Sequence, residues 1–343
     1  MSGVSGMRAF VISGPRCGEV QQVARPALRP GEVIVDIERA GVCGTDVELF
    51  TGELAYLHTG EASYPIRIGH EWCGVVSAAG PGVDPAWVGR RVTGDTMLGC
   101  GTCRCCAAGR RYLCAQRFEI GIRRGWPGAL AEQLPVPAWA LHALPARVDP
   151  ALGALAEPGG NAMRAFAGSA TGPGDRLLIL GPGTIGLLTA LIAAARGVEV
   201  HLLGLTEASL RFARSVGLEH AWTAATLPGL AWDAVVNAST ASDLPGRALD
   251  LVEPGGRVVY IGLAGQPSPV DTRTVVLKDV TAIGLLGGSG GLAAAIGSYA
   301  AAEVNPRPLV AATVGLDQTA AVLAGDRDPA WGDAPKIHVD PRR

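Results

Sequence analysis

A glycine-rich turn after an apolar segment constrains the fold of this chain more than any other feature. RLLIL (176–180) is predicted as a buried strand, and the following residues contain G-x-G-x-x-G and continue as an apolar helix. In a dinucleotide-binding turn, the first glycine allows the tight turn, the second lets a pyrophosphate approach, and the third lets the helix pack on the strand. A strand–helix turn without a ligand is the alternative, because 48 glycines produce such patterns by chance. The predicted cofactor turn is Gly181, Gly183, Thr184, Ile185 and Gly186.

The pattern of strands and helices predicts two domains. Between residues 151 and 290, strands such as VEVHLL and GRVVYIG alternate with helices such as EASLRFARSVG, which predicts a parallel sheet with crossover helices. Before residue 150, short runs such as EVIVDIERAG are broken by glycine and proline and predict a β-rich unit. We therefore expect an α/β fold, with a Rossmann domain at 151–290 inserted between 1–150 and 291–343 of a β-rich domain.

Composition excludes several classes of partner. The chain has 48% hydrophobic residues and a net charge of −2, which favours neither nucleic acid nor an anionic membrane. No apolar run reaches the roughly 18 residues that a membrane span needs, and MSGVSGMRAF does not resemble a signal peptide. We expect a cytoplasmic protein that binds neither nucleic acid nor membrane.

The position that usually binds the adenosine ribose does not carry an acidic residue in this sequence. In dinucleotide domains a carboxylate usually ends the second strand, but here that position is Gly204. Glu207 follows, either as a ribose ligand or as a helix-dipole partner. Without the acid, a 2′-phosphate meets no repulsion there, and Thr206 and Ser209 are small polar residues able to receive it. The sequence therefore predicts NADP or NAD, with a modest preference for NADP.

Five of the eight cysteines lie within fifteen residues, 100–114. A reducing cytosol disfavours disulfides, so this cluster favours metal binding. Four thiolates at such short spacings suit a closed tetrahedral zinc site, which has no open position for a substrate. Cys105 breaks the spacing. The predicted structural zinc ligands are Cys100, Cys103, Cys106 and Cys114.

A second constellation offers a zinc site that can take a substrate. GVCGTD contains Cys43, IGHEWCG contains His70 and Glu71, and LAEPGGN contains Glu157. A thiolate, an imidazole and a carboxylate from distant segments can bind zinc and leave a coordination position free. Each residue alone has an ordinary interpretation as a buried side chain.

Together these motifs resemble the zinc-dependent medium-chain dehydrogenases, the alcohol, sorbitol, threonine and glucose dehydrogenase group. CGTD, GHE, the four-cysteine lobe and the glycine-rich turn follow one another in the same order over nearly the whole length. The resemblance implies a GroES-like catalytic domain and two zinc ions per chain. It also implies zinc ligation by Cys43 and His70, with Glu71 as a ligand or close partner and Glu157 in the remaining position, directly or through water.

The resemblance also implies a reaction, namely transfer of a hydride between a secondary alcohol and a nicotinamide. Asp46 would orient His70, and Thr45 would accept the substrate proton. Many relatives have histidine where Glu48 stands, and a carboxylate can also carry a proton. Glutamate at position 157, where some members have cysteine, favours a polyol, sugar or cyclitol-like substrate. A homodimer or homotetramer is implied as well.

The sequence allows two other functions, and it does not decide the role of one loop. The chain could be a zinc-binding interaction module, or a zinc-free enone or quinone reductase on the same scaffold. The segment 51–68 is predicted either to overhang the substrate pocket, with Tyr56 and His58 facing it, or to be a solvated loop.

Overall fold

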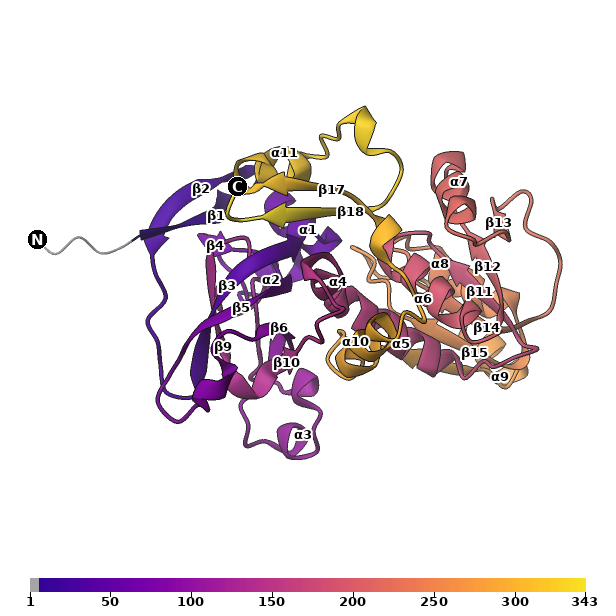
Figure 1. Cartoon of the computed structure of the whole chain (residues 1–343). Helices are drawn as coiled ribbons and strands as arrows, with labels where there is room; N and C mark the ends of the chain where they lie inside the picture. The colour runs from indigo at the N-terminus through magenta and orange to yellow at the C-terminus, as the bar shows by residue number, and fades with distance from the viewer. Residues whose placement is uncertain (1–5) are drawn as a thin grey trace, which may run out of the picture. The chain divides into compact units, whose positions relative to one another are not determined.

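The computed structural model describes residues 6–343 and divides into two compact units. The first comprises Met1–Glu157, Val310–Gly332 and Lys336–Arg343, and the second comprises Pro158–Leu309 and Asp333–Pro335. One boundary therefore falls inside helix α5 (Ala156–Ser169). Each unit has its own sheets, which Figure 1 labels along the chain.

The second unit is built on a parallel sheet with strand order β13-β12-β11-β14-β15-β16. In chain order this is 3-2-1-4-5-6, the doubly wound arrangement in which ligands bind where the order reverses, here between β11 and β14. The predicted Rossmann sheet is therefore confirmed. Its strands are β11 (Arg176–Leu180), β12 (Glu199–Leu203), β13 (Ala221–Trp222), β14 (Trp232–Asn237), β15 (Val252–Tyr260) and β16 (Thr281–Gly284).

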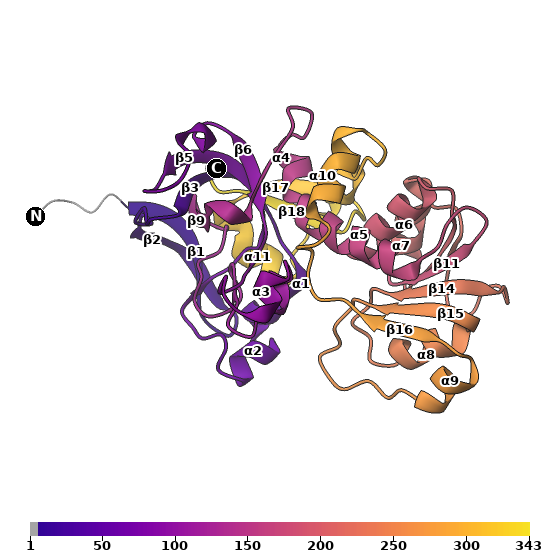
Figure 2. The same cartoon turned by 90° about the horizontal axis from the view of Figure 1, so that it is seen from below.

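Helices cover both faces of this sheet, so its central strands are apolar on both sides. Leu178, Leu180 and Val235 are fully buried in the core between them. Figure 2 shows α6 and α7 on one side of the sheet and α8 and α9 on the other. The helices after α5 are α6 (Thr184–Ala194), α7 (Glu207–Ser215), α8 (Leu244–Leu251), α9 (Thr272–Leu277) and α10 (Leu292–Ala300).

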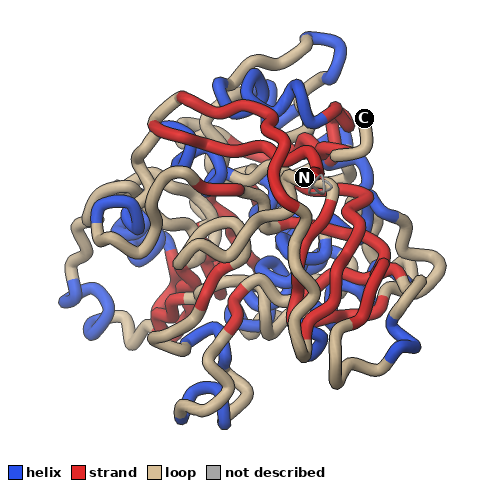
Figure 3. Tube along the Cα trace, turned by 90° about the vertical axis from the view of Figure 1, so that its left-hand side faces the viewer, coloured by secondary structure: helices blue, strands red, loops and turns tan. Residues whose placement is uncertain are grey.

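The first unit is rich in short strands, as Figure 3 shows from its side. Its main sheet runs β10-β6-β5-β3-β18-β17 with β9 also paired to β3, and two small sheets are β2-β1-β4 and β7-β8. The strands are β1 (Gly6–Gly14), β2 (Cys17–Ala24), β3 (Glu32–Gly41), β4 (Ile66–Arg67), β5 (Glu71–Ala79), β6 (Arg91–Gly94), β7 (Met97–Leu98), β8 (Phe118–Glu119), β9 (Gln133–Pro137), β10 (Leu141–Ala143), β17 (Val310–Gly315) and β18 (Lys336–Asp340). The helices are α1 (Gly44–Thr51), α2 (Ala55–His58), α3 (Arg104–Ala107), α4 (Pro150–Ala154) and α11 (Thr319–Ala324).

Strand β18, from the end of the chain, lies between β3 and β17 in this main sheet. It pairs in parallel with β17 and antiparallel with β3, where His338 lies opposite Gly41. On the other side of β3, Gly41 lies opposite Glu71, the first residue of β5. The sheet therefore places the start of β18 close to the start of β5.

Candidate metal centre and cofactor turn

The structure gathers three predicted ligands into one cluster. Candidate donor atoms of Cys43, His70 and Glu71 all lie within 4.8 Å of one another. Cys43 precedes α1 and is half-buried, whereas His70 and Glu71, at the start of β5, are 5% and 1% exposed. Segments that are separate in the sequence thus meet at one buried point.

Asp46 ties the two segments of this cluster together. Its carboxylate accepts hydrogen bonds from the Cys43 backbone N–H at 2.9 Å and from the Gly69 backbone N–H at 3.1 Å. The His70 Nδ1 atom is 3.6 Å from the same carboxylate, which is too long for a hydrogen bond. Asp46 therefore acts mainly through the backbone beside each ligand.

The cluster fits a bound cation. His70 Nδ1 is buried and has no hydrogen-bond partner, although buried polar atoms rarely stay unpaired. Burial lowers the pKa of His70, but the Asp46 carboxylate and the Cys43 thiol raise it by more, so the pKa is held well above its usual value. Positive charge is therefore favoured here, and sulfur, nitrogen and carboxylate oxygen are donors that zinc accepts.

The other predicted catalytic residues are not members of this three-residue cluster. Glu157 is buried in the first turn of α5 but is not a member of the three-residue group. Thr45 and Glu48 are half-buried and lie three residues apart on α1, so both face the same side of that helix. Burial, followed by the charge of Glu53, raises the pKa of Glu48.

Four cysteines form a second cluster in the lobe around α3, which projects from the sheets of the first unit (Figure 1). Their sulfur atoms lie within 4.8 Å of one another, with Cys103–Cys106 at 3.5 Å and Cys100–Cys106 at 4.0 Å. A zinc tetrahedron with bonds of about 2.3 Å has sulfur–sulfur edges of about 3.8 Å, so the lobe fits a closed zinc site. Cys105 is outside the group. Hydrogen bonds from the Thr102 side chain and backbone lower the pKa of Cys100 to about 6, whereas burial raises the pKa of Cys106 to about 12.

The glycine-rich turn has the geometry of a cofactor cradle. Gly181 has a φ of 104°, which a side chain would strain. At Gly183, which precedes α6, an added Cβ would meet no atom within 4 Å, so the space above the backbone is open. At Gly186 a Cβ would lie 1.9 Å from the Gly181 carbonyl oxygen, so only glycine lets helix and strand pack this closely. Each of the three positions needs glycine for a different reason. A pyrophosphate-binding turn imposes the same three requirements.

The end of β12 carries glycine and small polar residues near the start of α7. Thr206 precedes α7, and its hydroxyl accepts a hydrogen bond from the Ser209 backbone N–H at 3.3 Å. Glu207 forms an exposed ion pair with Arg214 at 2.8 Å. Gly204 is tightly surrounded, because a Cβ there would lie 2.8 Å from Leu210 Cδ2 and 2.9 Å from Pro182 Cγ.

The segment 51–68 is held by a partly buried polar network. The Tyr56 hydroxyl donates to Glu119 at 3.2 Å and accepts from Arg117 at 3.0 Å. Arg123, which is 6% exposed, pairs with Glu61 and lies over the Tyr56 ring. His58 is exposed. Tyr56 is thus fixed against residues 117–123, whereas His58 fits the solvated-loop hypothesis.

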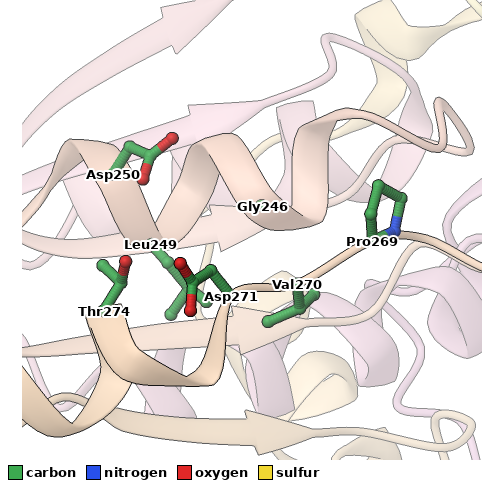
Figure 4. Close-up of a pocket in the computed structure, with 7 residues that line it drawn as sticks. All are labelled: Gly246, Leu249, Asp250, Pro269, Val270, Asp271 and Thr274. Carbon is green, nitrogen blue, oxygen red and sulfur yellow. The ribbon is translucent and has the colours of Figure 1, made fainter.

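A surface pocket of the second unit is lined by residues distant in sequence from the metal clusters. It has a volume of about 430 Å³ and lies between α8 and α9 (Figure 4). None of the predicted site residues lines it. Its lining residues are Gly246, Leu249, Asp250, Pro269, Val270, Asp271 and Thr274.

Comparisons with known proteins agree with this geometry. Residues 29–146 match the family model of the alcohol dehydrogenase GroES-like domain, and residues 184–301 match that of the zinc-binding dehydrogenase. The chain is 33% identical over 296 residues to an L-threonine 3-dehydrogenase of Saccharopolyspora erythraea, covering 82% of this chain and 84% of that protein.

Solved structures show the same likeness. A zinc-binding dehydrogenase from Sinorhizobium meliloti, bound to NADP, is 28% identical with a TM-score of 0.88, covering 98% of this chain and all of that one. A thermostable alcohol dehydrogenase from Pyrobaculum aerophilum is 26% identical with a TM-score of 0.86, over 98% and 100% of the two chains.

The chain therefore belongs to the zinc-dependent medium-chain alcohol dehydrogenase family. It is an oxidoreductase whose cofactors are zinc and a nicotinamide dinucleotide, and the predicted α/β fold with a GroES-like domain is confirmed. This membership argues against the interaction module and the zinc-free reductase. Within residues 6–343, no helix is long and apolar enough to cross a membrane.

Two residues beside the metal cluster, Lys336 and Gly41, could not be predicted from the sequence. The Lys336 ammonium lies 2.8 Å from both carboxylate oxygens of Glu71, 265 residues away in sequence. A Cβ on Gly41 would lie 2.1 Å from Glu71 Oε2. The only signal was a lysine at the start of the predicted strand KIHVD, which names no partner.

Proposed function

We propose that this enzyme interconverts a secondary alcohol of the polyol, sugar or cyclitol type and its ketone, using a nicotinamide cofactor and a zinc ion held by Cys43, His70 and Glu157. The observation that carries the proposal is the cluster of the Cys43 thiol and the His70 imidazole, with the Glu71 carboxylate beside them. Glu157, buried in the first turn of α5, would supply the remaining ligand. The relative named L-threonine 3-dehydrogenase supports the alcohol class, because its name places the reaction at a carbon bearing a secondary hydroxyl.

The roles of the two units follow from their residues. We assign the chemistry to the first unit, which contains both metal clusters, and cofactor binding to the second, which contains the glycine-rich turn. Bound zinc would polarise the substrate hydroxyl, and a bound nicotinamide would accept a hydride from the carbon that bears this hydroxyl. Thr45 accepts the hydroxyl proton, and Glu48 passes it outward along the same side of α1.

The function is tested by three matched substitutions. His70→Ala should leave one zinc per chain and no activity on any alcohol of a panel of polyols, sugars, cyclitols and L-threonine. Cys106→Ser should remove the other zinc and destabilise the lobe, whereas Cys105→Ser should keep both ions, because Cys105 lies outside the cluster. Elemental analysis and steady-state kinetics measure these effects. A wild-type protein with fewer than two zinc ions, or inactive on the whole panel, would contradict the proposal.

The proton route predicts a pH dependence. Glu48 accepts a proton only when ionised, and its pKa is raised, so kcat/KM should increase with pH through that raised pKa. Glu48→Gln should flatten this limb. Glu53→Gln removes a charge that raises the pKa, so it should shift the limb to lower pH. An unchanged profile in Glu48→Gln would exclude Glu48 from the route.

We propose that the enzyme accepts both cofactors and prefers NADP modestly. Three features support this choice. Position 204 is glycine and not an acid, and the Glu207 carboxylate is paired with Arg214. The zinc-binding dehydrogenase from Sinorhizobium meliloti was solved bound to NADP. Thr206 and Ser209 would bind the 2′-phosphate at the start of α7.

The cofactor preference is measured as kcat/KM for NADP and NAD with one working substrate. Gly204→Asp should shift the ratio toward NAD by about tenfold or more, because a charged hydrogen bond is gained and a repulsion is added. Gly204→Ala is the control, since any side chain must displace Leu210 and Pro182. A strong NAD preference in the wild type would be the contrary result.

We propose that the enzyme is a homodimer, or a tetramer built from such dimers, joined at β16. This edge strand pairs only with β15 among the described strands, and its residues carry no charge. Val276 and Leu277, just before it, are 78% and 85% exposed. Uncharged edges flanked by apolar side chains favour self-association.

Sedimentation equilibrium should therefore give a multiple of the 35.1 kDa chain mass. Ile283→Lys should dissociate the assembly, and Leu28→Lys in the first unit should not. A monomeric wild type would contradict the proposal. We also propose a cytoplasmic location, supported by the lobe's need for reduced thiols and checked by cell fractionation.

A further inference from the structure

Lys336 and Glu71 form a buried ion pair beside the metal cluster. The Lys336 Nζ atom lies 2.8 Å from each carboxylate oxygen of Glu71 and 2.9 Å from the Val42 carbonyl oxygen. The two charged side chains are 3% and 2% exposed. All three ammonium protons therefore have acceptors, which a buried ion pair needs to offset its loss of hydration.

The main sheet of the first unit holds this pair in place. Gly41 lies between the two partners' strands, opposite Glu71 on one side and His338 on the other. A side chain at Gly41 would occupy the space of the Glu71 carboxylate, as the 2.1 Å approach of a Cβ shows. The glycine provides the space, and the lysine fixes the carboxylate within it.

The same carboxylate is close enough to the cluster to become a ligand. Its oxygen lies within 4.8 Å of the candidate donor atoms of Cys43 and His70. Zinc and Lys336 are thus two cations competing for one carboxylate.

We propose that Lys336 is a positioning residue that keeps the Glu71 carboxylate from binding the metal held by Cys43 and His70. Glu71 then contributes negative charge near the metal without occupying a coordination position, and that position stays available to the substrate. This inference rests on the proposed function, because it requires a metal at the cluster. It also decides between the two roles that the sequence left open for Glu71.

Cobalt(II) provides a readout other than activity, because its visible spectrum weakens and shifts when a ligand is added to a four-coordinate site. The His70→Ala protein supplies the spectrum of the lobe alone, which is subtracted. Lys336→Met removes the charge and keeps most of the length, so Glu71 should bind the metal. We expect weaker, shifted cobalt bands, about tenfold slower zinc release to a chelator, and a lower kcat. Lys336→Arg keeps the charge and should retain the wild-type spectrum.

Two further variants separate positioning from simple structural support. Lys336→Met/Glu71→Gln should restore the wild-type spectrum, because the amide is a poor zinc ligand. Glu71→Gln alone leaves Lys336 an oxygen acceptor and should not alter the spectrum, which keeps the test valid even where Lys336→Met does not fold. An altered spectrum in Glu71→Gln, or a wild-type spectrum in folded Lys336→Met, would overturn the proposal. Cobalt binding only in the lobe of the wild type would instead refute the proposed function.

Discussion

The metal cluster depends on one buried carboxylate, that of Asp46. It is fully buried and receives two backbone N–H groups, one from Cys43 before α1 and one from Gly69 before β5. Hydrogen bonds to a charged acceptor are about twice as strong as neutral ones, and two of them offset much of the cost of burying the charge. Two segments of the chain are thus joined at the backbone, and their side chains, Cys43 and His70, are brought into the same small volume.

The negative charges buried around Asp46 are partly balanced by a buried positive charge. Asp46 and Glu71 are both buried acids near Cys43, and Lys336 is the buried cation that pairs with one of them. The lobe differs from this site, because its four sulfur atoms would surround a bound metal completely and leave no position for a substrate. The two clusters therefore have different chemistry although both suit zinc.

Local sequence patterns predicted much of this molecule. The glycine-rich turn could be predicted because each glycine answers a local requirement: a φ of 104° at Gly181, open space at Gly183 and close packing at Gly186. The cysteine cluster of the lobe could be predicted for the same reason, since its four members lie within fifteen residues. The α/β fold followed from the alternation of strands and helices.

Contacts between distant strands could not be predicted in this way. Lys336 reaches Glu71 only because β18 enters the sheet beside β3, and nothing in KIHVD specifies that register. Asp46 was expected to orient His70, but its hydrogen bonds from the backbone N–H groups of Cys43 and Gly69 could not be predicted, because the side-chain pattern does not reveal them. Similarly, Tyr56 is fixed by Arg117 and Glu119, about sixty residues later in the chain.

The zinc content of Asp46→Asn tests the central claim most directly. Asparagine keeps the shape but presents an NH2 group to one of the two backbone N–H groups, so the link between Cys43 and Gly69 should break. Asp84→Asn is the matched control, because Asp84 accepts a backbone N–H from Ala86 at 2.9 Å at an exposed turn. After mild chelation, we expect one zinc per chain in Asp46→Asn, two in the control, and an intact lobe in both. Retention of both ions by Asp46→Asn, with wild-type release rates, would contradict the account.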